Sequence, residues 1–303
     1  MEDCHSGIDL KHPHKNRISG FIKLTRAEHS VMLAFAVIAA EIILGFKITL
    51  PLFVLALLPP ILVSMGAFAI NDYFDVEVDR KNGFLNRPLV DHTFTKAEAV
   101  CVYLVTTVLG IIASALINPY VFIITLIFAG AAYFYSYKLK EVVIIGNAYI
   151  AFSMAIPFIY GNYIITSILN PNILLISIIV FLSGFGREIH GMVRDAEGDK
   201  GVRKIRNIVH YFGEKGANLI SAALYTVSIF LSLFMFFFML PFKGNALYLI
   251  PMAIVDIVLV YNMRIYFTKN AKKHYGLSRN LSLAAMAAAT LIFIASSIFY
   301  LSL

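Results

Sequence analysis

Acidic residues follow two apolar segments of this chain at spacings that favour metal binding. The first group, Asp72, Asp75 and Asp79, comes directly after one apolar run. On a helix these three carboxylates fall within an arc of about 60°, and Glu77 points to the opposite side. Carboxylates stacked on one face repel one another unless a cation lies among them. Mg²⁺ is the natural cation, because it binds one or two carboxylates together with the phosphates of a substrate.

The second group of acids, Asp195 and Asp199, follows another apolar run far downstream. These residues are four apart, so they stack on one helical face, and Glu197 between them points away. Taken alone, the first group also fits an ordinary solvated helix. Together, the two groups predict half-sites that face one polyphosphate through metal ions, provided that both lie on the same side of a membrane.

The composition places these groups in a membrane protein. Of the 303 residues, 59% are hydrophobic and 14% are charged, and the mean hydropathy is +0.79. Soluble domains carry about 25% charged residues. The two cysteines lie in a polar arm and in an apolar run, so neither a disulfide nor a thiolate metal site is expected. The positions of the charges say more than the net charge of +7, and no nucleic-acid partner is expected.

Nine apolar segments match, or nearly match, the roughly 20 residues that a membrane-spanning helix needs. They cover residues 30–46, 49–70, 97–117, 119–137, 142–163, 172–186, 217–241, 245–267 and 281–302. The sixth is short and is expected to extend by a turn. Residues 1–29 form a basic arm with an interfacial stretch, and residues 30–303 form the bundle. The sequence therefore predicts an all-α, multi-pass membrane protein.

The distribution of Lys and Arg supports this count. With nine spans, all 25 Lys and Arg residues except Lys47 and Lys243 fall on the side of the N-terminus. A miscounted span would exchange the sides of all later loops and destroy this asymmetry. Because cytoplasmic loops carry the excess of cations, the N-terminus and both acidic groups are expected to face the cytoplasm of a cell-membrane protein.

The motifs resemble the two signatures of the UbiA-type intramembrane prenyltransferases, N-D-x-x-D-x-x-x-D and D-x-x-x-D. The residues that match them are Asn71, Asp72, Asp75 and Asp79 in the first signature and Asp195 and Asp199 in the second. The segments N-R-P-L at 86–89 and Y-S-Y-K-L-K at 135–140 also resemble the family. The agreement in motifs and in the number of spans covers nearly the whole chain.

The resemblance implies nine helices around a chamber open to lipid, with two Mg²⁺ ions, or Mn²⁺ in their place, at its cytoplasmic mouth. The metal ligands that it implies are Asp72, Asp75, Asp79, Asp195 and Asp199. Asn71 would orient the diphosphate of an isoprenyl substrate, and Tyr135 would stabilise the allylic cation through its ring. The phosphate contacts that we expect are Arg87, Lys138, Lys200, Arg203 and Lys204.

Members of this family transfer an isoprenyl group from its diphosphate to a lipid-soluble acceptor. Archaeal members use geranylgeranylglyceryl phosphate, and others use aromatic quinone, chlorin or haem precursors. The basic segment from Arg203 to Arg206 favours the phosphorylated lipid, and an aromatic acceptor is the alternative.

Two other classes of protein are alternatives. The CDP-alcohol phosphotransferases also use clustered aspartates, but their glycine and Ala-Arg signature is absent after Asp75. A divalent-cation transporter needs ligands near the middle of the membrane, where Glu41 and Asp256 are the only candidates. Both acids are equally explained as ties between helices or as groups near the lipid headgroups.

Overall fold

The structure is a computed structural model that describes residues 16–142, 144–202, 208–268 and 274–302, and for residues 194–202 it describes the backbone alone. Within these ranges every regular element is a helix. The α-helices are α1 (Arg17–Thr25), α2 (Ala27–Ile43), α3 (Leu50–Lys81), α4 (Lys96–Ala115), α5 (Pro119–Tyr137), α6 (Ile145–Ile165), α7 (Pro171–Val202), α8 (Ile208–Phe238), α9 (Ala246–Tyr266) and α10 (Tyr275–Ser302), and a 3₁₀ helix, η1 (Leu139–Glu141), follows α5.

Several helix starts follow from local capping. The Asn16 side chain accepts hydrogen bonds from the first backbone N–H groups of α1. Helix α4 begins with a capping box, in which Thr95 and Glu98 each accept a hydrogen bond from the other's backbone N–H. Asn118 caps α5 directly before Pro119, which has no N–H group to leave unsatisfied at the first helical position.

Nine long helices, α2 to α10, follow the nine predicted spans in the same order. Eight helices of the described part of the chain are long and apolar enough to cross a membrane. The remaining long helix, α2, has 17 residues, which is at the lower limit for a spanning helix. The predicted all-α, multi-pass fold is therefore confirmed, and α2 is its shortest long helix.

Helices α3 and α7 are much longer than a membrane requires. Each has 32 residues and is therefore about 48 Å long, whereas the hydrocarbon core of a bilayer is about 30 Å thick. The sixth predicted span, 172–186, extends as expected but by more than one turn, because α7 continues as a helix to Val202. The extensions of α3 and α7 carry the two acidic groups.

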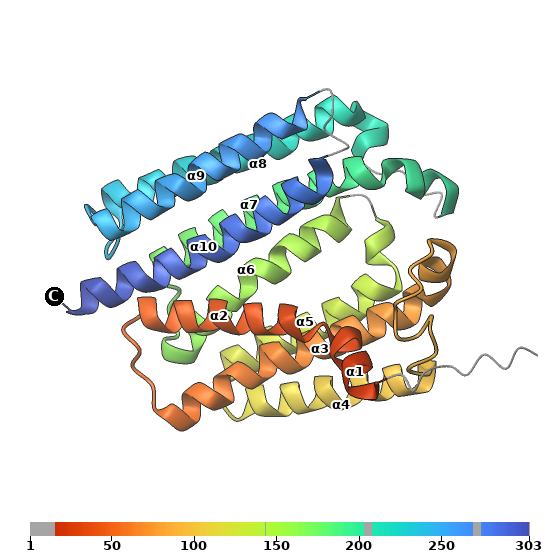
Figure 1. Cartoon of the computed structure of the whole chain (residues 1–303). Helices are drawn as coiled ribbons and strands as arrows, with labels where there is room; N and C mark the ends of the chain where they lie inside the picture. The colour runs from red at the N-terminus through yellow and green to blue at the C-terminus, as the bar shows by residue number, and fades with distance from the viewer. Residues whose placement is uncertain (1–15, 143, 203–207, 269–273, 303) are drawn as a thin grey trace, which may run out of the picture.

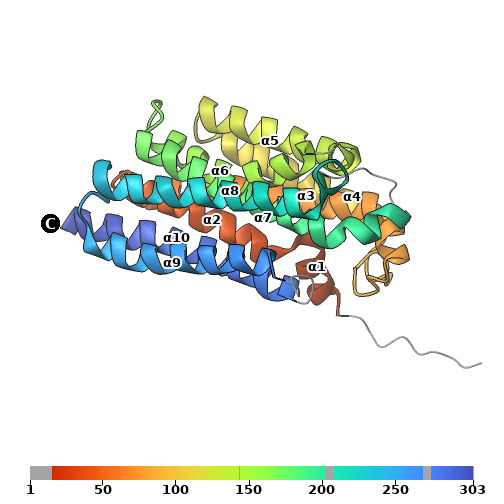
Figure 2. The ribbon, with the colours of Figure 1, turned by 90° about the horizontal axis from the view of Figure 1, so that it is seen from above.

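The long helices run side by side, with their axes roughly along one direction (Figures 1 and 2). Helix α2 packs against α3, α6 and α10, and α10 also packs against α9, so the last long helix contacts the first. The final turns of α3 and α7 lie at the same end of the bundle in both views. This arrangement agrees with the prediction that both acidic groups face one side, and the cytoplasmic orientation of that side stays a prediction.

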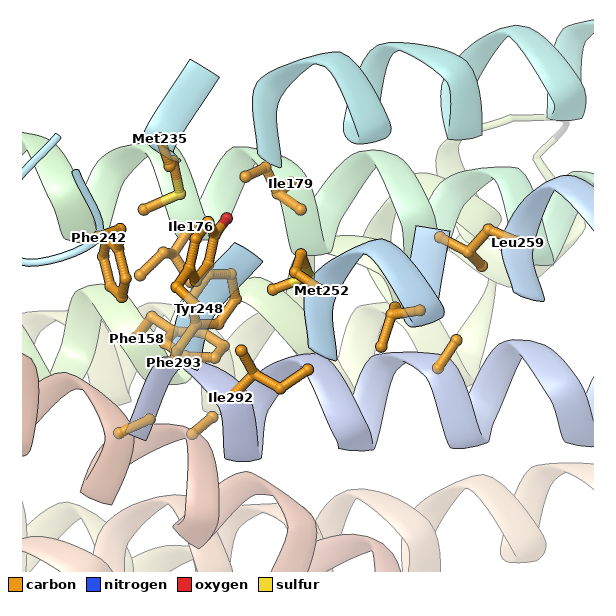
Figure 3. Close-up of a cluster of buried hydrophobic side chains, with 14 of the residues drawn as sticks. Phe158, Ile176, Ile179, Met235, Phe242, Tyr248, Met252, Leu259, Ile292 and Phe293 are labelled. Carbon is orange, nitrogen blue, oxygen red and sulfur yellow. The ribbon is translucent and has the colours of Figure 1, made fainter. Parts of the chain in front are cut away.

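The aromatic part of the largest hydrophobic core lies toward the other end of the bundle (Figure 3). Its aromatic side chains include Phe158 of α6, Phe242 between α8 and α9, Tyr248 of α9 and Phe293 of α10. The Tyr248 hydroxyl donates a hydrogen bond to the Ser232 carbonyl at 2.9 Å. This core fastens the C-terminal helices together and leaves the acidic end of the bundle to the functional site.

Apolar side chains also cover the outward faces of the helices. On α4, for example, Leu104, Val108 and Ile112 are exposed. Large contiguous apolar surfaces are rare on soluble monomers, whereas lipid is an apolar solvent for them. The exterior therefore suits a protein whose long helices lie in a bilayer.

Candidate active site

The three aspartates of the first acidic group lie on the buried face of α3. Asp72, Asp75 and Asp79 are 2%, 9% and 8% exposed, whereas Glu77 lies on the exposed side and pairs with Arg80. The i, i+3, i+7 spacing produces this division, as the sequence predicts. Three carboxylates buried together are costly unless positive charges compensate them.

Two arginines from outside α3 compensate Asp72. Arg26 Nη2 donates a hydrogen bond to Asp72 Oδ1 at 3.1 Å, and Arg87 Nη1 donates to the same oxygen at 3.4 Å. Arg87 also approaches Asp79, with 3.7 Å between Nε and Oδ2. Arg87, which the sequence predicts as a phosphate contact, and Arg26, which it does not predict, therefore supply positive charge to the aspartates themselves.

Arg26 reaches the site from a strained corner of the backbone. It joins α1 to α2 with φ 43° and ψ 55°, in the left-handed region, which costs a residue other than glycine about 1–3 kcal/mol. Its guanidinium lies 4.6 Å from the centroid of the Phe68 ring and contacts Asp72. These two contacts hold the side chain against α3.

Arg87 is positioned by the connection between α3 and α4, residues 82–95. Leu89 and Phe94 of this connection are buried, and they pack in one cluster with Leu24 of α1. The connection is therefore anchored directly after Arg87, and these apolar contacts hold the guanidinium beside the aspartates.

Asp75 is compensated by Lys140, whose Nζ donates a hydrogen bond to Asp75 Oδ1 at 2.7 Å. Lys140 belongs to η1, whereas Lys138, the lysine named from the sequence, is exposed just before it. The turn of the 3₁₀ helix decides which lysine reaches α3, and sequence spacing alone does not contain that information. A phosphate contact of Lys138 stays a prediction, and Lys140 is a site residue that the sequence analysis missed.

The aspartates of α3 fit a magnesium ion in their chemistry. Asp72 Oδ1 accepts hydrogen bonds from both arginines, but Asp72 Oδ2 is buried and has no hydrogen-bond partner among the described residues. A buried oxygen without a partner is costly, and a carboxylate oxygen is a preferred Mg²⁺ ligand. Among the side chains that the structure describes, no three His, Cys, Asp or Glu groups gather as a metal site, so ligands from elsewhere are needed.

The second acidic group lies on the last turns of α7. The backbone is helical there, so Asp195 and Asp199 are one turn apart. The side chains of these two residues and of Lys200 are not described, and Arg203 and Lys204 lie outside the described residues. The end of α7 shares one end of the bundle with the end of α3 (Figure 1), and the ligand role of its aspartates stays a prediction.

A mainly apolar cavity of about 700 Å³ reaches Arg26, whose side chain donates a hydrogen bond to Asp72. Residues of α2, α3, α5, α6, α7 and α10 line it. Asn71, next to Asp72 in the chain, and Tyr135 both line this cavity, and both are predicted site residues. The Tyr135 ring stacks on Tyr149, with 4.7 Å between the ring centroids. The structure thus brings a polar mouth, aromatic faces and an apolar chamber together.

Charged residues outside the predicted spans also line the cavity. Arg187 and Glu188 lie on α7, and Arg279 lies on α10. Because α7 continues beyond the predicted end of its span, the first two belong to a helical wall of the chamber. The sequence signal that could have identified them is the adjacent pair of opposite charges, Arg187 and Glu188, directly after an apolar run.

The two acids within the other spans are not among the described residues that line this cavity. Asp256 of α9 accepts a hydrogen bond from Ser232 Oγ of α8 at 2.9 Å, which ties two helices together. Glu41 is fully buried in α2, and neither of its carboxylate oxygens has a hydrogen-bond partner in the described part of the chain.

Comparison with known proteins assigns the family. The family model of the UbiA prenyltransferase family matches residues 30–284. The digeranylgeranylglyceryl phosphate synthase of Archaeoglobus fulgidus is 31% identical over 253 residues, which cover 82% of this chain and 84% of that relative.

Solved structures agree with this assignment. A structure from work on digeranylgeranylglyceryl phosphate synthase in membranes superposes with a TM-score of 0.77 at 26% identity, covering 93% of this chain and 99% of the other. The fold is also similar to that of a UbiA homolog from Archaeoglobus fulgidus bound to GPP and Mg²⁺, with a TM-score of 0.62, 20% identity and coverage of 94% and 100%. The chain therefore belongs to the UbiA prenyltransferase family.

Proposed function

We propose that this membrane prenyltransferase transfers a geranylgeranyl group from its diphosphate to the free hydroxyl of geranylgeranylglyceryl phosphate and releases diphosphate. The observation that carries the choice of acceptor is the 31% identity, over most of both chains, to a digeranylgeranylglyceryl phosphate synthase. Membership of an enzyme family replaces the transporter and the CDP-alcohol phosphotransferase as explanations of the acidic groups.

The aspartates of both groups are the proposed ligands of Mg²⁺. They are Asp72, Asp75 and Asp79 of α3 and Asp195 and Asp199 of α7, which we expect to hold two ions and to accept Mn²⁺ as well. A similar fold has been solved with GPP and Mg²⁺ bound, which supports this assignment. The ions would neutralise the charge that the diphosphate gains when the allylic C–O bond breaks.

The cations around the aspartates are the proposed contacts of the diphosphate. Arg26, Arg87 and Lys140 already meet carboxylates at 2.7 to 3.4 Å, so an anion at the same place is within reach of their side chains. Asn71, at the wall of the cavity, would orient the diphosphate with its amide. Contacts from Lys138 and Lys200 complete the expected set.

The chamber is the proposed site of the isoprenyl chain. Its volume of about 700 Å³ lies within the usual range for ligand pockets. The allylic carbon becomes positively charged during C–O cleavage, and the face of Tyr135 offers electron density to such a cation. An apolar lining also excludes water, which would otherwise react with the cation.

The phosphate of the acceptor is assigned to Arg203 and Lys204. A phosphorylated lipid approaches a diphosphate of the same sign, so cations between the two anions reduce the repulsion. An acceptor without phosphate, such as an aromatic precursor, has no use for these two residues. We also propose that the mouth of the site faces the cytoplasm, because nearly all cations flank the spans on that side.

A comparison of acceptors tests this proposal. Purified protein with Mg²⁺ and geranylgeranyl diphosphate would receive geranylgeranylglyceryl phosphate, 4-hydroxybenzoate, a dihydroxynaphthoate or a chlorophyllide, each in a separate reaction. We expect mass spectrometry to detect a prenylated product of the phosphorylated lipid only. A product from an aromatic acceptor alone would reject the lipid assignment and keep the prenyl-transfer chemistry.

A further inference from the structure

Glu188 is the only carboxylate among the described residues that line the chamber. Its side chain is 18% exposed, and Arg187 Nη1 donates a hydrogen bond to Glu188 Oε1 at 2.7 Å. Ionisable groups at membrane depth are expensive and usually functional. Neither metal binding nor diphosphate binding, as proposed above, uses this acid.

Close helix packing fixes the direction in which Glu188 points. A Cβ atom on Gly184 would lie 3.2 Å from Met154 Sδ of α6, and one on Gly186 would lie 3.1 Å from the Ser221 carbonyl oxygen of α8. The Ser221 hydroxyl also donates a hydrogen bond to the Gly186 carbonyl at 2.6 Å. Helix α7 is therefore held tightly between its neighbours within one turn of Glu188, which leaves its side chain on the wall of the chamber.

Prenylation of an alcohol needs a proton acceptor. The hydroxyl oxygen forms an ether bond to the first prenyl carbon, and the diphosphate leaves with the electron pair of the broken C–O bond. The hydroxyl proton must then move to a base. Water is excluded from an apolar chamber, so the base must be a group that lines the chamber or the departing diphosphate itself.

We propose that Glu188 is this base and that its carboxylate takes the proton of the attacking hydroxyl. The inference rests on the proposed transfer to an alcohol acceptor. Arg187 is a positioning residue, because its ion pair holds the carboxylate. Arg26 and Arg279 line the same chamber, so the described lining is positively charged overall and suits an acceptor that carries a phosphate.

The test compares an alcohol acceptor with its thiol analogue. Glu188→Gln keeps the size of the side chain and removes the base, so we expect kcat with geranylgeranylglyceryl phosphate to fall by about 10²–10⁴-fold. A thiol in place of the hydroxyl ionises near pH 8.5 without help. With the thiol analogue we therefore expect the kcat of Glu188→Gln to fall by less than about tenfold. The KM for the prenyl diphosphate should stay near its wild-type value.

Two further variants control for folding and for charge. Glu188→Asp keeps a carboxylate, so its kcat with the alcohol acceptor should exceed that of Glu188→Gln. Glu77→Gln removes an exposed acid outside the site and should have at most a mild effect on activity.

Each remaining outcome overturns the assignment. If Glu188→Gln lowered kcat equally with the alcohol and with the thiol, the role of Glu188 would be structural. An unchanged kcat would show that the diphosphate takes the proton. Glu188→Asp activity at or below that of Glu188→Gln would also reject a base at this position. If wild-type protein prenylates neither acceptor, the proposed function itself fails, and the role of Glu188 fails with it.

Discussion

Removing the charge of Lys140 should destabilise the protein through the charge that remains on Asp75. The two side chains are 10% and 12% exposed, and 2.7 Å separates Nζ from Oδ1. At an effective dielectric constant of about 20, unit charges at this distance attract each other by about 6 kcal/mol before the desolvation cost is subtracted. Loss of one partner of a buried pair costs about 3–5 kcal/mol. We therefore expect Lys140→Met to lower the free energy of unfolding by about 3 kcal/mol without metal.

A double-mutant cycle with Asp75→Asn isolates the interaction. If the pair stabilises the fold, the double variant loses less free energy of unfolding than the sum of the losses in the two single variants. We expect a coupling free energy of about 2 kcal/mol. The assay is reversible unfolding in mixed detergent micelles with a metal chelator, followed by circular dichroism. A coupling free energy below about 0.5 kcal/mol would refute the reasoning, because independent sites add within that limit.

The same helix offers a matched control. Glu77 and Arg80 form an ion pair of α3 with 3.3 Å between Nη1 and Oε2, but their side chains are 62% and 46% exposed. Exposed pairs contribute below about 1 kcal/mol, so the cycle of Glu77→Gln and Arg80→Met should show little coupling. Equal coupling in both pairs would mean that burial is not what makes the Lys140 pair strong.

Three further predictions concern the site. Asp75→Asn and Asp199→Asn should each abolish Mg²⁺-dependent turnover in folded protein, whereas Glu77→Gln and Glu197→Gln should have only a mild effect on turnover. Near wild-type turnover of both aspartate variants would contradict a site built from the two acidic groups. In a Cys-free background, cysteines at Gly83 and Lys204 should react with a membrane-impermeant reagent only from the cytoplasmic side and one at Lys243 only from outside. Labelling of Gly83 and Lys204 from opposite sides excludes a shared site. Arg203→Ala or Lys204→Ala should raise the KM for the phosphorylated acceptor more than the KM for the prenyl diphosphate and leave kcat comparatively unchanged. If the steady-state kinetics of these variants equal those of the wild-type protein, the two cations only set the membrane topology.

The fold was largely predictable, because the membrane imposes one length and one polarity on every span. The error at α7 shows the limit of this signal. Hydropathy falls at Arg187 and Glu188, but the helix continues to Val202. Hydropathy reports the surroundings of a helix, and a helix that leaves the apolar layer keeps its backbone hydrogen bonds. The charged pair therefore fell outside the predicted span, although it lines the chamber.

The aspartates of the site were predictable for a different reason. Their common face depends only on helical periodicity within eight residues. Their cationic partners come from far along the chain, since Arg26 is 46 residues from Asp72 and Lys140 is 65 residues from Asp75. Such contacts depend on how α1, η1 and α3 pack together, which no local spacing contains. The choice of Lys138 over Lys140 is the clearest consequence.

These ion pairs also explain how three buried carboxylates persist before substrate arrives. Asp72 and Asp75 each hold a cation through Oδ1, so the aspartates are neutralised and kept in place. On the proposed function, an incoming diphosphate is an alternative partner for Arg26 and Lys140. When those cations turn to the diphosphate, the carboxylate oxygens that held them become available to metal ions. Metal ions and diphosphate should therefore each raise the affinity of the site for the other, because linkage between two ligands is reciprocal.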